Sequence, residues 1–158
     1  MSDPRDAIYG RYDTEKPVVV FGTQGLSQLT AYVLTHDSPF DVMGYVVDQS
    51  YLATSQSPDG PPLFAFESLP DQLSPDECQL IIPLGYTQIN GIRRARCEAA
   101  QAMGYSLISY VSSKACVWPN LQMGHNSLIF EHTVIQPYAR IGDNCVIRSS
   151  VHLSHHVC

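Results

Sequence analysis

Residues 111–158 read VSSKACVWPNLQMGHNSLIFEHTVIQPYARIGDNCVIRSSVHLSHHVC, and this stretch decides the fold. Written in sixes, its hexads each begin with an aliphatic residue: Val111, Val117, Met123, Ile129, Ile135, Ile141, Ile147 and Leu153. The fifth positions are small or β-branched almost throughout: Ala115, Leu121, Ser127, Thr133, Ala139, Cys145, Val151 and Val157. Because residues two apart in a strand share a face, the fifth residue of one hexad and the first of the next both point inward. The period of six therefore predicts a parallel β-helix in which three hexads, roughly 18 residues, form one coil.

The alternative for this stretch is an ordinary β-sandwich. Its strands would alternate with period two and be separated by turn signals roughly every 8–12 residues, which a fixed period of six does not match. The repeat also runs into Cys158 in the middle of a coil. Since the ends of a solenoid need caps over apolar rungs and strand edges, we expect the chain to be a fragment of a longer protein. A partner chain that covers the open end is the alternative.

The first two thirds of the chain alternate between short apolar runs and helical patterns. The β-branched run Val18–Phe21 is typical of a buried parallel strand, and it is followed by a glycine turn and a helix at 26–35. The remaining expected elements are a strand at 42–47, a loop at 49–62, a short strand at 63–66, a polar connection at 71–76, a strand at 78–83, a helix at 89–103 and a last strand at 105–110. This alternation predicts a three-layer α/β sandwich with a mainly parallel sheet.

The expected fold is therefore an α/β Rossmann-like N-terminal domain followed by a left-handed parallel β-helix that is apparently truncated. Residues 1–16 are polar and are expected to form a flexible leader. The nucleotide-binding domain is placed at 17–110, and the start of the hexapeptide-repeat domain at 111–158.

Composition excludes several classes of protein. The chain has 158 residues, a formal net charge of -6 and 44% hydrophobic residues, which is typical of a globular protein and not of a general nucleic-acid binder. The cluster Arg93, Arg94 and Arg96 is interpreted as the solvated face of a helix. The N-terminus contains no apolar core, so neither a secretory signal nor membrane insertion is expected. The five scattered cysteines argue against a disulfide framework and a structural zinc site, and a cytoplasmic location is the default.

One candidate site is the turn between the first strand and the first helix. Residues Gly22, Thr23, Gln24 and Gly25 are expected to present backbone amides at a helix N-terminus, where a phosphate can bind. Asp48 follows the second strand and is placed to accept hydrogen bonds from a ribose or a base. The pattern G-x-x-G-x-S lacks the third glycine of a dinucleotide fingerprint, so a plain tight turn stays open as the alternative.

Two further substrate-binding candidates, Gly85 and Tyr86, follow the 78–83 strand. The carboxyl ends of parallel strands meet at one edge of the sheet, where ligands of such folds collect. We therefore expect these two residues to lie at the same edge as the glycine turn and Asp48.

The second candidate site is the histidine group His152, His155 and His156. The hexad register places His155 and His156 on the outside or at a corner of the coil, so neither is a core residue. An exposed histidine near its normal pKa can remove a proton from an amine or hydroxyl at neutral pH. His125 and His132, in earlier repeats, are expected to be ordinary surface residues.

A Rossmann-like domain followed directly by hexapeptide repeats resembles the bacterial sugar O-acyltransferase family, which includes sialic-acid O-acetyltransferases and nucleotide-sugar N-acetyltransferases. The resemblance runs from VVVFGTQGLS to SSVHLSHHVC. It implies that Gly22 and Gly25 lie near the diphosphate of a nucleotide-sugar and Asp48 near its base, with Ser27 in place of the last glycine. It also implies that His155 is catalytic and that His156 occupies the place where relatives often carry an acid that orients the imidazole.

The implied reaction is direct acetyl transfer from acetyl-CoA, without a metal. His155 would take a proton from the amine or hydroxyl of the sugar, which then attacks the thioester, and a backbone amide would stabilise the oxyanion. Cys158 is interpreted as a repeat filler. The resemblance further implies a homotrimer built through the β-helix. Two alternatives stay open: a non-catalytic nucleotide-sugar-binding trimer, and a zinc carbonic-anhydrase-like β-helix enzyme in which the histidines bind the metal.

Overall fold

The computed structural model describes residues 3–58 and 60–158. They form two compact units, which are described separately below. The α/β unit consists of Glu15–His36 and Phe40–Leu107, and the coil unit consists of Ile108–Cys158, Asp37–Pro39 and the residues before Glu15.

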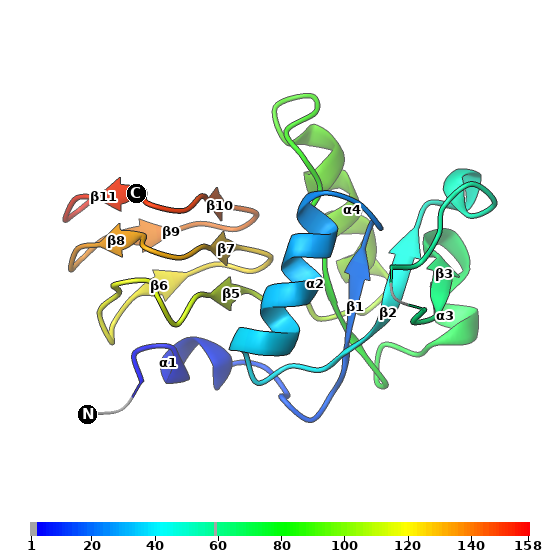
Figure 1. Cartoon of the computed structure of the whole chain (residues 1–158), viewed down its shortest axis with the longest axis horizontal. Coiled ribbons are helices and arrows are strands. Elements are labelled where there is room, and N and C mark those ends of the chain that lie inside the picture. Colours follow the sequence, from blue (N-terminus) through cyan, green and yellow to red (C-terminus); the bar gives the residue numbers. More distant parts are fainter. Residues whose placement is uncertain (1–2, 59) are drawn as a thin grey trace. The chain divides into compact units, whose positions relative to one another are not determined.

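The α/β unit is built on a parallel sheet with the strand order β3-β2-β1-β4 (Figure 1). The strands are β1 (Val18–Phe21), β2 (Val42–Val47), β3 (Leu63–Ala65) and β4 (Gln79–Ile81). Every residue of β1 is buried, because this central strand is covered on both faces and its sequence is apolar throughout.

Helices cover both faces of this sheet. The longer ones are α2 (Leu26–Asp37) and α4 (Gly91–Ala102), and the short ones are α3 (Leu69–Gln72) and the 3₁₀ turns η1 (Gln49–Tyr51) and η2 (Phe66–Ser68). Residues Cys97 and Ala100 of α4 pack with Val19 and Leu80 of the sheet in one apolar cluster, which Leu69 of α3 also joins. Figure 1 shows α2 in front of the sheet and α4 behind it. The expected helix–sheet–helix layering is therefore present.

The expected last strand at 105–110 is wrong. The structure retains only a single parallel bridge, between Leu80 and Leu107, beside β4. Tyr110 belongs instead to β5 (Tyr110–Val111), the first strand of the coil unit. The apolar run YSLISY is long enough for one strand, but it is divided between the two units. Leu107 lies beside β4 in the α/β unit, whereas Tyr110 begins the first strand of the coil unit.

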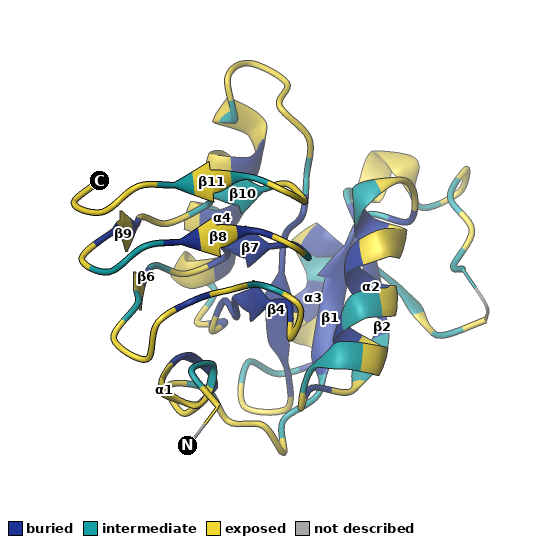
Figure 2. Cartoon of the chain, turned by 60° about the vertical axis from the view of Figure 1, so that its left-hand side comes forward, coloured by how far each residue is buried: buried dark blue, intermediate teal, exposed yellow. Residues whose placement is uncertain are grey.

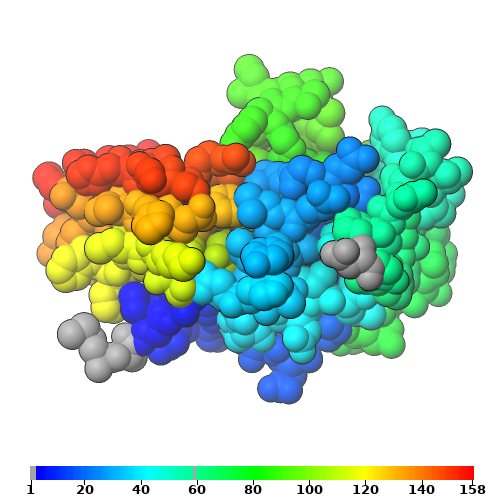
Figure 3. Space-filling view, viewed as in Figure 1, coloured from blue at the N-terminus to red at the C-terminus, as the bar shows by residue number. Residues whose placement is uncertain are grey.

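The coil unit repeats every 18 residues. In the row formed by β5, β7 (Leu128–Ile129) and β10 (Val146–Ile147), Tyr110 pairs in parallel with Leu128, which pairs with Val146. The other rows have the same spacing: β6 (Gln122–Met123) pairs with β9 (Arg140–Ile141), and β8 (Val134–Ile135) pairs with β11 (His152–Leu153). This confirms the predicted coil of three hexads, and Figure 3 shows the successive layers from yellow to red.

Each hexad ends its turn with the same backbone conformation. Positive φ angles, all between 51° and 67°, recur every six residues at Asn126, His132, Tyr138, Asn144, Ser150 and His156. The aliphatic first positions point inward and are buried in the earlier coils, as at Val111, Ile129 and Ile135. In the last coil Leu153 is only half-buried and Val157 is 39% exposed. Figure 2 shows the difference between the coils, with β7 buried and β11 exposed or half-buried.

The small residues at the fifth hexad positions also bond one coil to the next. Ser109 Oγ donates to Gly124 O, and Ser127 Oγ donates to Gly142 O, both at 2.8 Å. The same two hydroxyls accept hydrogen bonds from the backbone amides of Ser127 and Cys145, each at 3.0 Å. A hydroxyl at this corner therefore satisfies backbone groups that a bulky apolar side chain would leave unpaired.

The N-terminal segment is ordered against the first coil, so the expectation of a flexible leader is wrong for it. It contains α1 (Asp6–Tyr9), in which Ile8 and Tyr9 are buried. The Tyr9 hydroxyl donates to Val111 O at 2.9 Å and accepts from Val111 N at 3.2 Å, and Arg11 Nη1 donates to Met123 O. The first coil has no preceding coil to bond its backbone, and these side chains of the N-terminal segment provide hydrogen bonds to its carbonyls and amides instead.

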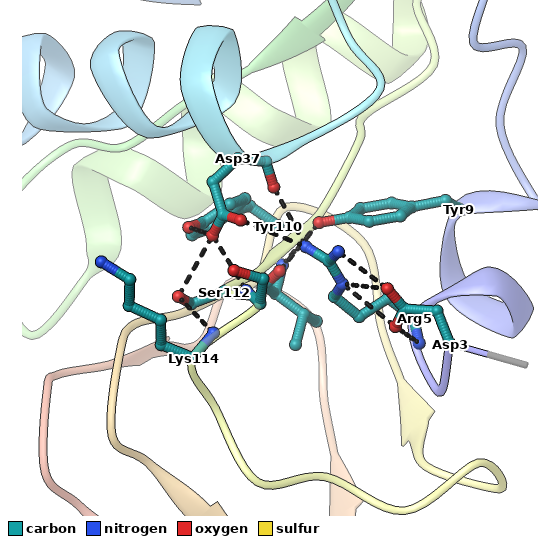
Figure 4. Close-up of polar contacts among 9 residues, drawn as sticks. Asp3, Arg5, Tyr9, Asp37, Tyr110, Ser112 and Lys114 are labelled. Atoms are coloured by element: carbon teal, nitrogen blue, oxygen red, sulfur yellow. Dashed lines mark hydrogen bonds and ion pairs between the residues drawn. The ribbon is translucent and has the colours of Figure 1, made fainter. Parts of the chain in front are cut away.

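Asp37 is the centre of a polar cluster in the coil unit (Figure 4). Its Oδ2 accepts hydrogen bonds from the Tyr110 hydroxyl at 2.7 Å, from Ser113 N at 2.9 Å and from Ser112 Oγ at 3.2 Å. Arg5 Nη1 donates to Asp37 O at 3.1 Å and lies 3.4 Å from Oδ1. Burial alone would raise the pKa of Asp37, but the hydrogen bonds outweigh it and hold the pKa below its usual value.

Within the described ranges, none of the helices has both the length and the apolar character that crossing a bilayer requires.

Candidate functional site

A cavity of about 630 Å³ lies in the α/β unit at the carboxyl ends of β1, β2 and β4. Of the residues predicted for substrate binding, five line it: Gly22, Thr23, Gln24, Asp48 and Gly85. Gly25 and Tyr86 are not among the lining residues, and Tyr86 is largely exposed. The structure thus brings most of the predicted positions around one cavity, at the sheet edge where parallel folds collect ligands.

The conformation of Gly22 explains why this turn carries glycine. Its φ angle is 88°, and a Cβ atom there would lie 2.5 Å from Ser27 Oγ. Ser27 is buried and donates a 2.7 Å hydrogen bond to Phe21 O, the last carbonyl of β1. The serine that replaces the third glycine of the fingerprint therefore closes the turn, and only glycine fits opposite it.

The backbone amides that follow Gly22 are open to a ligand. Among residues 3–58 and 60–158, no group accepts a hydrogen bond from the amides of Thr23, Gln24, Gly25 or Leu26. These amides sit at the start of the 12-residue helix α2, whose dipole favours negative charge at this end. The combination of open amides and a cavity lined by the same turn can hold a phosphate group.

Asp48 lines the cavity and is paired with an arginine that the sequence reasoning missed. Arg96 Nε lies 2.7 Å from Asp48 Oδ1. The interpretation of the arginine cluster as a solvated face is correct only for Arg94, whose side chain is 75% exposed beside Glu98. Arg93 is 1% exposed and donates from Nη1 to Leu84 O at 2.8 Å.

The helical spacing alone could have shown that Arg93 and Arg96 do not lie on the solvated face, although it does not identify their partners. Arg93 lies four residues before Cys97 and seven before Ala100, and these three are the residues of α4 that are buried. Arg96 lies four residues after Ile92, which lines the cavity. Helical residues three or four apart share a face, so two of the arginines fall on or beside the inward stripe.

The histidines predicted to be catalytic lie next to each other in the coil unit. His155 Nδ1 is 2.9 Å from His156 Nδ1, and the ring of His156 stacks on Tyr138 with ring centroids 4.9 Å apart. The backbone amide of His155 donates to Gln136 Oε1 at 3.0 Å. The ring contact requires one protonated Nδ1 and one with a free lone pair, so at least one imidazole is neutral when the contact is made. His152, on β11, is exposed, and its ring makes no such contact with any residue that the structure describes.

The remaining polar candidates form no second centre. In the part of the chain that the structure describes, no group of three or more His, Cys, Asp or Glu side chains is arranged to hold a metal ion. His125 and His132 are both exposed, and His132 occupies one of the repeating corners. The five cysteines are free thiols, of which Cys78 and Cys97 are buried in the α/β unit.

No protein-family model matches the chain, and no curated protein matches it significantly. Solved structures do match. The acetyltransferase domain of PglB from Neisseria gonorrhoeae, in complex with acetyl coenzyme A, superposes with a TM-score of 0.74 at 22% identity over 89% of this chain. PerB from Caulobacter crescentus, in complex with CoA and GDP-perosamine, has a TM-score of 0.74 at 21% identity over 88%. WeeI from Acinetobacter baumannii has a TM-score of 0.68 at 13% identity over 89%.

These likenesses establish a shared fold. The chain spans 65%, 63% and 64% of the lengths of the three matched chains, respectively.

Proposed function

We propose that this chain is the nucleotide-sugar-binding part, together with the first coils, of an acetyltransferase that uses acetyl-CoA. The observation that carries the proposal is the cavity of the α/β unit, where the glycine turn offers open amides at a helix N-terminus. The shared fold with PglB, bound to acetyl coenzyme A, and with PerB, bound to CoA and GDP-perosamine, supports it. The acceptor is then a nucleotide-linked amino sugar or sialic acid.

The α/β unit is assigned as a Rossmann-like domain that binds the nucleotide part. The diphosphate would lie against the amides from Thr23 to Leu26, where backbone N–H groups and the dipole of α2 both favour an anion. Gly22 lets the turn stay tight, and the absence of a side chain at Gly85 leaves room across the cavity, because a Cβ at that position meets no atom within 4 Å. Asp48 supplies a hydrogen-bond acceptor for the nucleoside.

The histidine pair supplies the base. In the productive tautomer His155 donates from Nδ1 to Nδ1 of His156, which leaves Nε2 of His155 free to take the proton of the sugar's amine or hydroxyl. That oxygen or nitrogen then attacks the carbonyl carbon of the thioester. The thiolate of CoA leaves and takes a proton from the His155 imidazolium, so the residue returns neutral. His156 stands where an orienting acid would, and Tyr138 holds its ring by stacking.

We also infer a left-handed β-helix and a homotrimer assembled through the coils, as the family resemblance implies. The corners with positive φ at every sixth residue support a regular helix of one hand. Sedimentation equilibrium of the complete protein tests the assembly: a mass of three chains is expected, and a monomer would contradict it.

The proposal is tested by calorimetric titration of this chain with UDP-, GDP-, CMP- and dTDP-sugars and with acetyl-CoA. We expect one nucleotide-sugar to bind. Gly85→Leu should weaken that binding about tenfold or more, because the new side chain enters the cavity without a clash in the turn. Gly142→Leu is the matched control, since a Cβ there also meets nothing and the position lies in the coil unit. If the unchanged chain binds no nucleotide, the glycine turn is only a tight turn.

A further inference from the structure

Asp48 is held by a residue that lies outside the cavity. Its carboxylate lines the cavity, with a side chain only 18% exposed, while Arg96 on α4 is 32% exposed and does not line it. The two charged atoms are 2.7 Å apart, although the Arg96 N–H does not point along the line to the oxygen. The contact is therefore an ion pair in which charge matters more than hydrogen-bond direction.

Arg96 is itself fixed in place by the core. Its guanidinium lies over the ring of Phe66, 5.7 Å from the ring centroid. Phe66 is buried and makes an edge-to-face contact with Phe21, with centroids 5.2 Å apart, and Phe21 lines the cavity at the end of β1. A rigid aromatic platform thus places the guanidinium, and the guanidinium places the carboxylate.

The pairing leaves one oxygen of Asp48 for a ligand. Oδ1 is buried against Arg96, whereas Oδ2 contacts no hydrogen-bond donor among the described residues. A carboxylate oxygen accepts hydrogen bonds and, when ionised, donates none, so Oδ2 can receive a ribose hydroxyl or a base N–H. Without the arginine the carboxylate could turn, and that acceptor would lose its fixed direction.

The pairing also removes a charge conflict. A nucleoside diphosphate carries negative charge into the same cavity that Asp48 lines. An unpaired carboxylate in a partly buried site repels it, because Coulomb interactions are poorly screened there. A carboxylate neutralised by Arg96 does not, and the helix N-terminus can then act on the phosphates unopposed.

We propose that Arg96 is the positioning residue of the nucleotide site: it fixes Asp48 by one oxygen and cancels its charge, so that the cavity accepts a nucleoside diphosphate. This inference rests on the proposed function. It adds Arg96 of α4, which lies beside the cavity, to a site whose lining comes mainly from the ends of β1, β2 and β4 and includes Ile92 of the same helix.

The test compares Arg96→Met with Arg94→Met in the full 158-residue chain. Arg94 is the matched control because it lies on the same helix and its ion pair with Glu98 is exposed to solvent. The probes are UDP, GDP, CDP and dTDP, and then the nucleoside of whichever binds best. For the diphosphate we expect Arg96→Met to lose about tenfold or more in affinity, and Arg94→Met to stay within about twofold of the unchanged chain. The nucleoside, which lacks the phosphates, should lose less.

Two further variants separate positioning from simple loss of structure. Arg96→Lys keeps the charge and should retain most of the diphosphate affinity. Asp48→Asn in the Arg96→Met background removes the uncompensated charge and should recover part of the lost affinity for the diphosphate. Equal binding by Arg96→Met and the unchanged chain, or no recovery in the double variant, overturns the role of Arg96. Absence of nucleotide binding by the unchanged chain overturns the proposed function itself, and the inference with it.

Discussion

The two units place their functional groups in opposite ways. In the α/β unit the candidate site is made mainly of backbone: a glycine with a φ of 88°, and four amides after β1 that donate to no group in the described part of the chain. In the coil unit the backbone conformation is the same at every corner, and only the side chains distinguish the candidate site from the other corners. His156 stacks on Tyr138, which occupies the equivalent corner 18 residues before it. Added atoms should therefore break the first site, whereas removed side chains should break the second.

The largest effect is expected from removing a side chain in the coil unit. His155→Ala in the complete protein should lower turnover by about 10²-fold or more, because it removes the proton acceptor, and should leave nucleotide-sugar affinity nearly unchanged. Steady-state kinetics and calorimetry measure the two quantities separately. His152→Ala is the control, since this exposed histidine lies on the same coil and its ring contacts no other ring among the described residues. Full activity of His155→Ala would remove it from the mechanism.

The reverse experiment adds one carbon to the turn of the α/β unit. In Gly22→Ala the new Cβ would lie 2.5 Å from Ser27 Oγ at a φ of 88°, so we expect roughly 2–3 kcal/mol of destabilisation together with weaker nucleotide binding. Gly25→Ala has a φ of 54° but meets no atom within 4 Å, and should cost only about 1 kcal/mol. Urea unfolding measures both. Equal costs for the two variants would show that Ser27 does not restrict the turn.

The same contrast decides how far each region can be predicted from sequence. The coils follow from a one-dimensional pattern, because each hexad meets only its neighbours and aliphatic first positions such as Ile129 must point inward. The glycine turn and Asp48 are predictable for a similar reason, since they lie at ends of strands that sequence patterns reveal. The partnership of Arg96 with Asp48 is not, because it joins residues 48 apart through a packing of α4 that no local pattern specifies.

The order of the N-terminal segment and the role of Ser27 were also not predicted from the sequence, because each depends on a few specific contacts and not on a repeated pattern. The buried residues of α1 are Ile8 and Tyr9, and two adjacent side chains make no detectable period. Its order depends on Tyr9, whose pKa burial raises to about 12 and whose hydroxyl bonds the backbone of Val111. Ser27 was likewise treated as a departure from a glycine fingerprint, although its hydroxyl is the group that closes the turn.

A third prediction tests whether equivalent hydrogen bonds in successive coils contribute equally to the free energy of unfolding. Ser127→Ala removes the bond from Ser127 Oγ to Gly142 O and the bond from Cys145 N to the same hydroxyl. We expect about 1–2 kcal/mol of destabilisation, since two backbone groups lose their partner. Ser109→Ala removes the equivalent pair one coil earlier and should cost a similar amount. Chemical unfolding of both variants measures this, and a large difference between them would contradict a solenoid of equivalent coils.

The smallest effect is expected at Asp37, which lies in the coil unit outside the repeat. Its hydrogen bonds from Tyr110, Ser112 and Ser113 hold its pKa below the usual value, against the opposing effect of burial. A depressed pKa in the folded state adds stability above the pKa of the unfolded chain and loses it as the pH falls through the folded pKa. Asp37→Asn should therefore be about 1 kcal/mol less stable than the unchanged chain at pH 7. The two stabilities should begin to converge as the pH falls past about 4, the pKa of an unperturbed aspartate, and should meet only below the lower folded-state pKa of Asp37, where the carboxylate is protonated in both states. Thermal unfolding between these pH values measures the convergence, and a constant difference would mean that the cluster depends on the shape of the side chain and not on its charge.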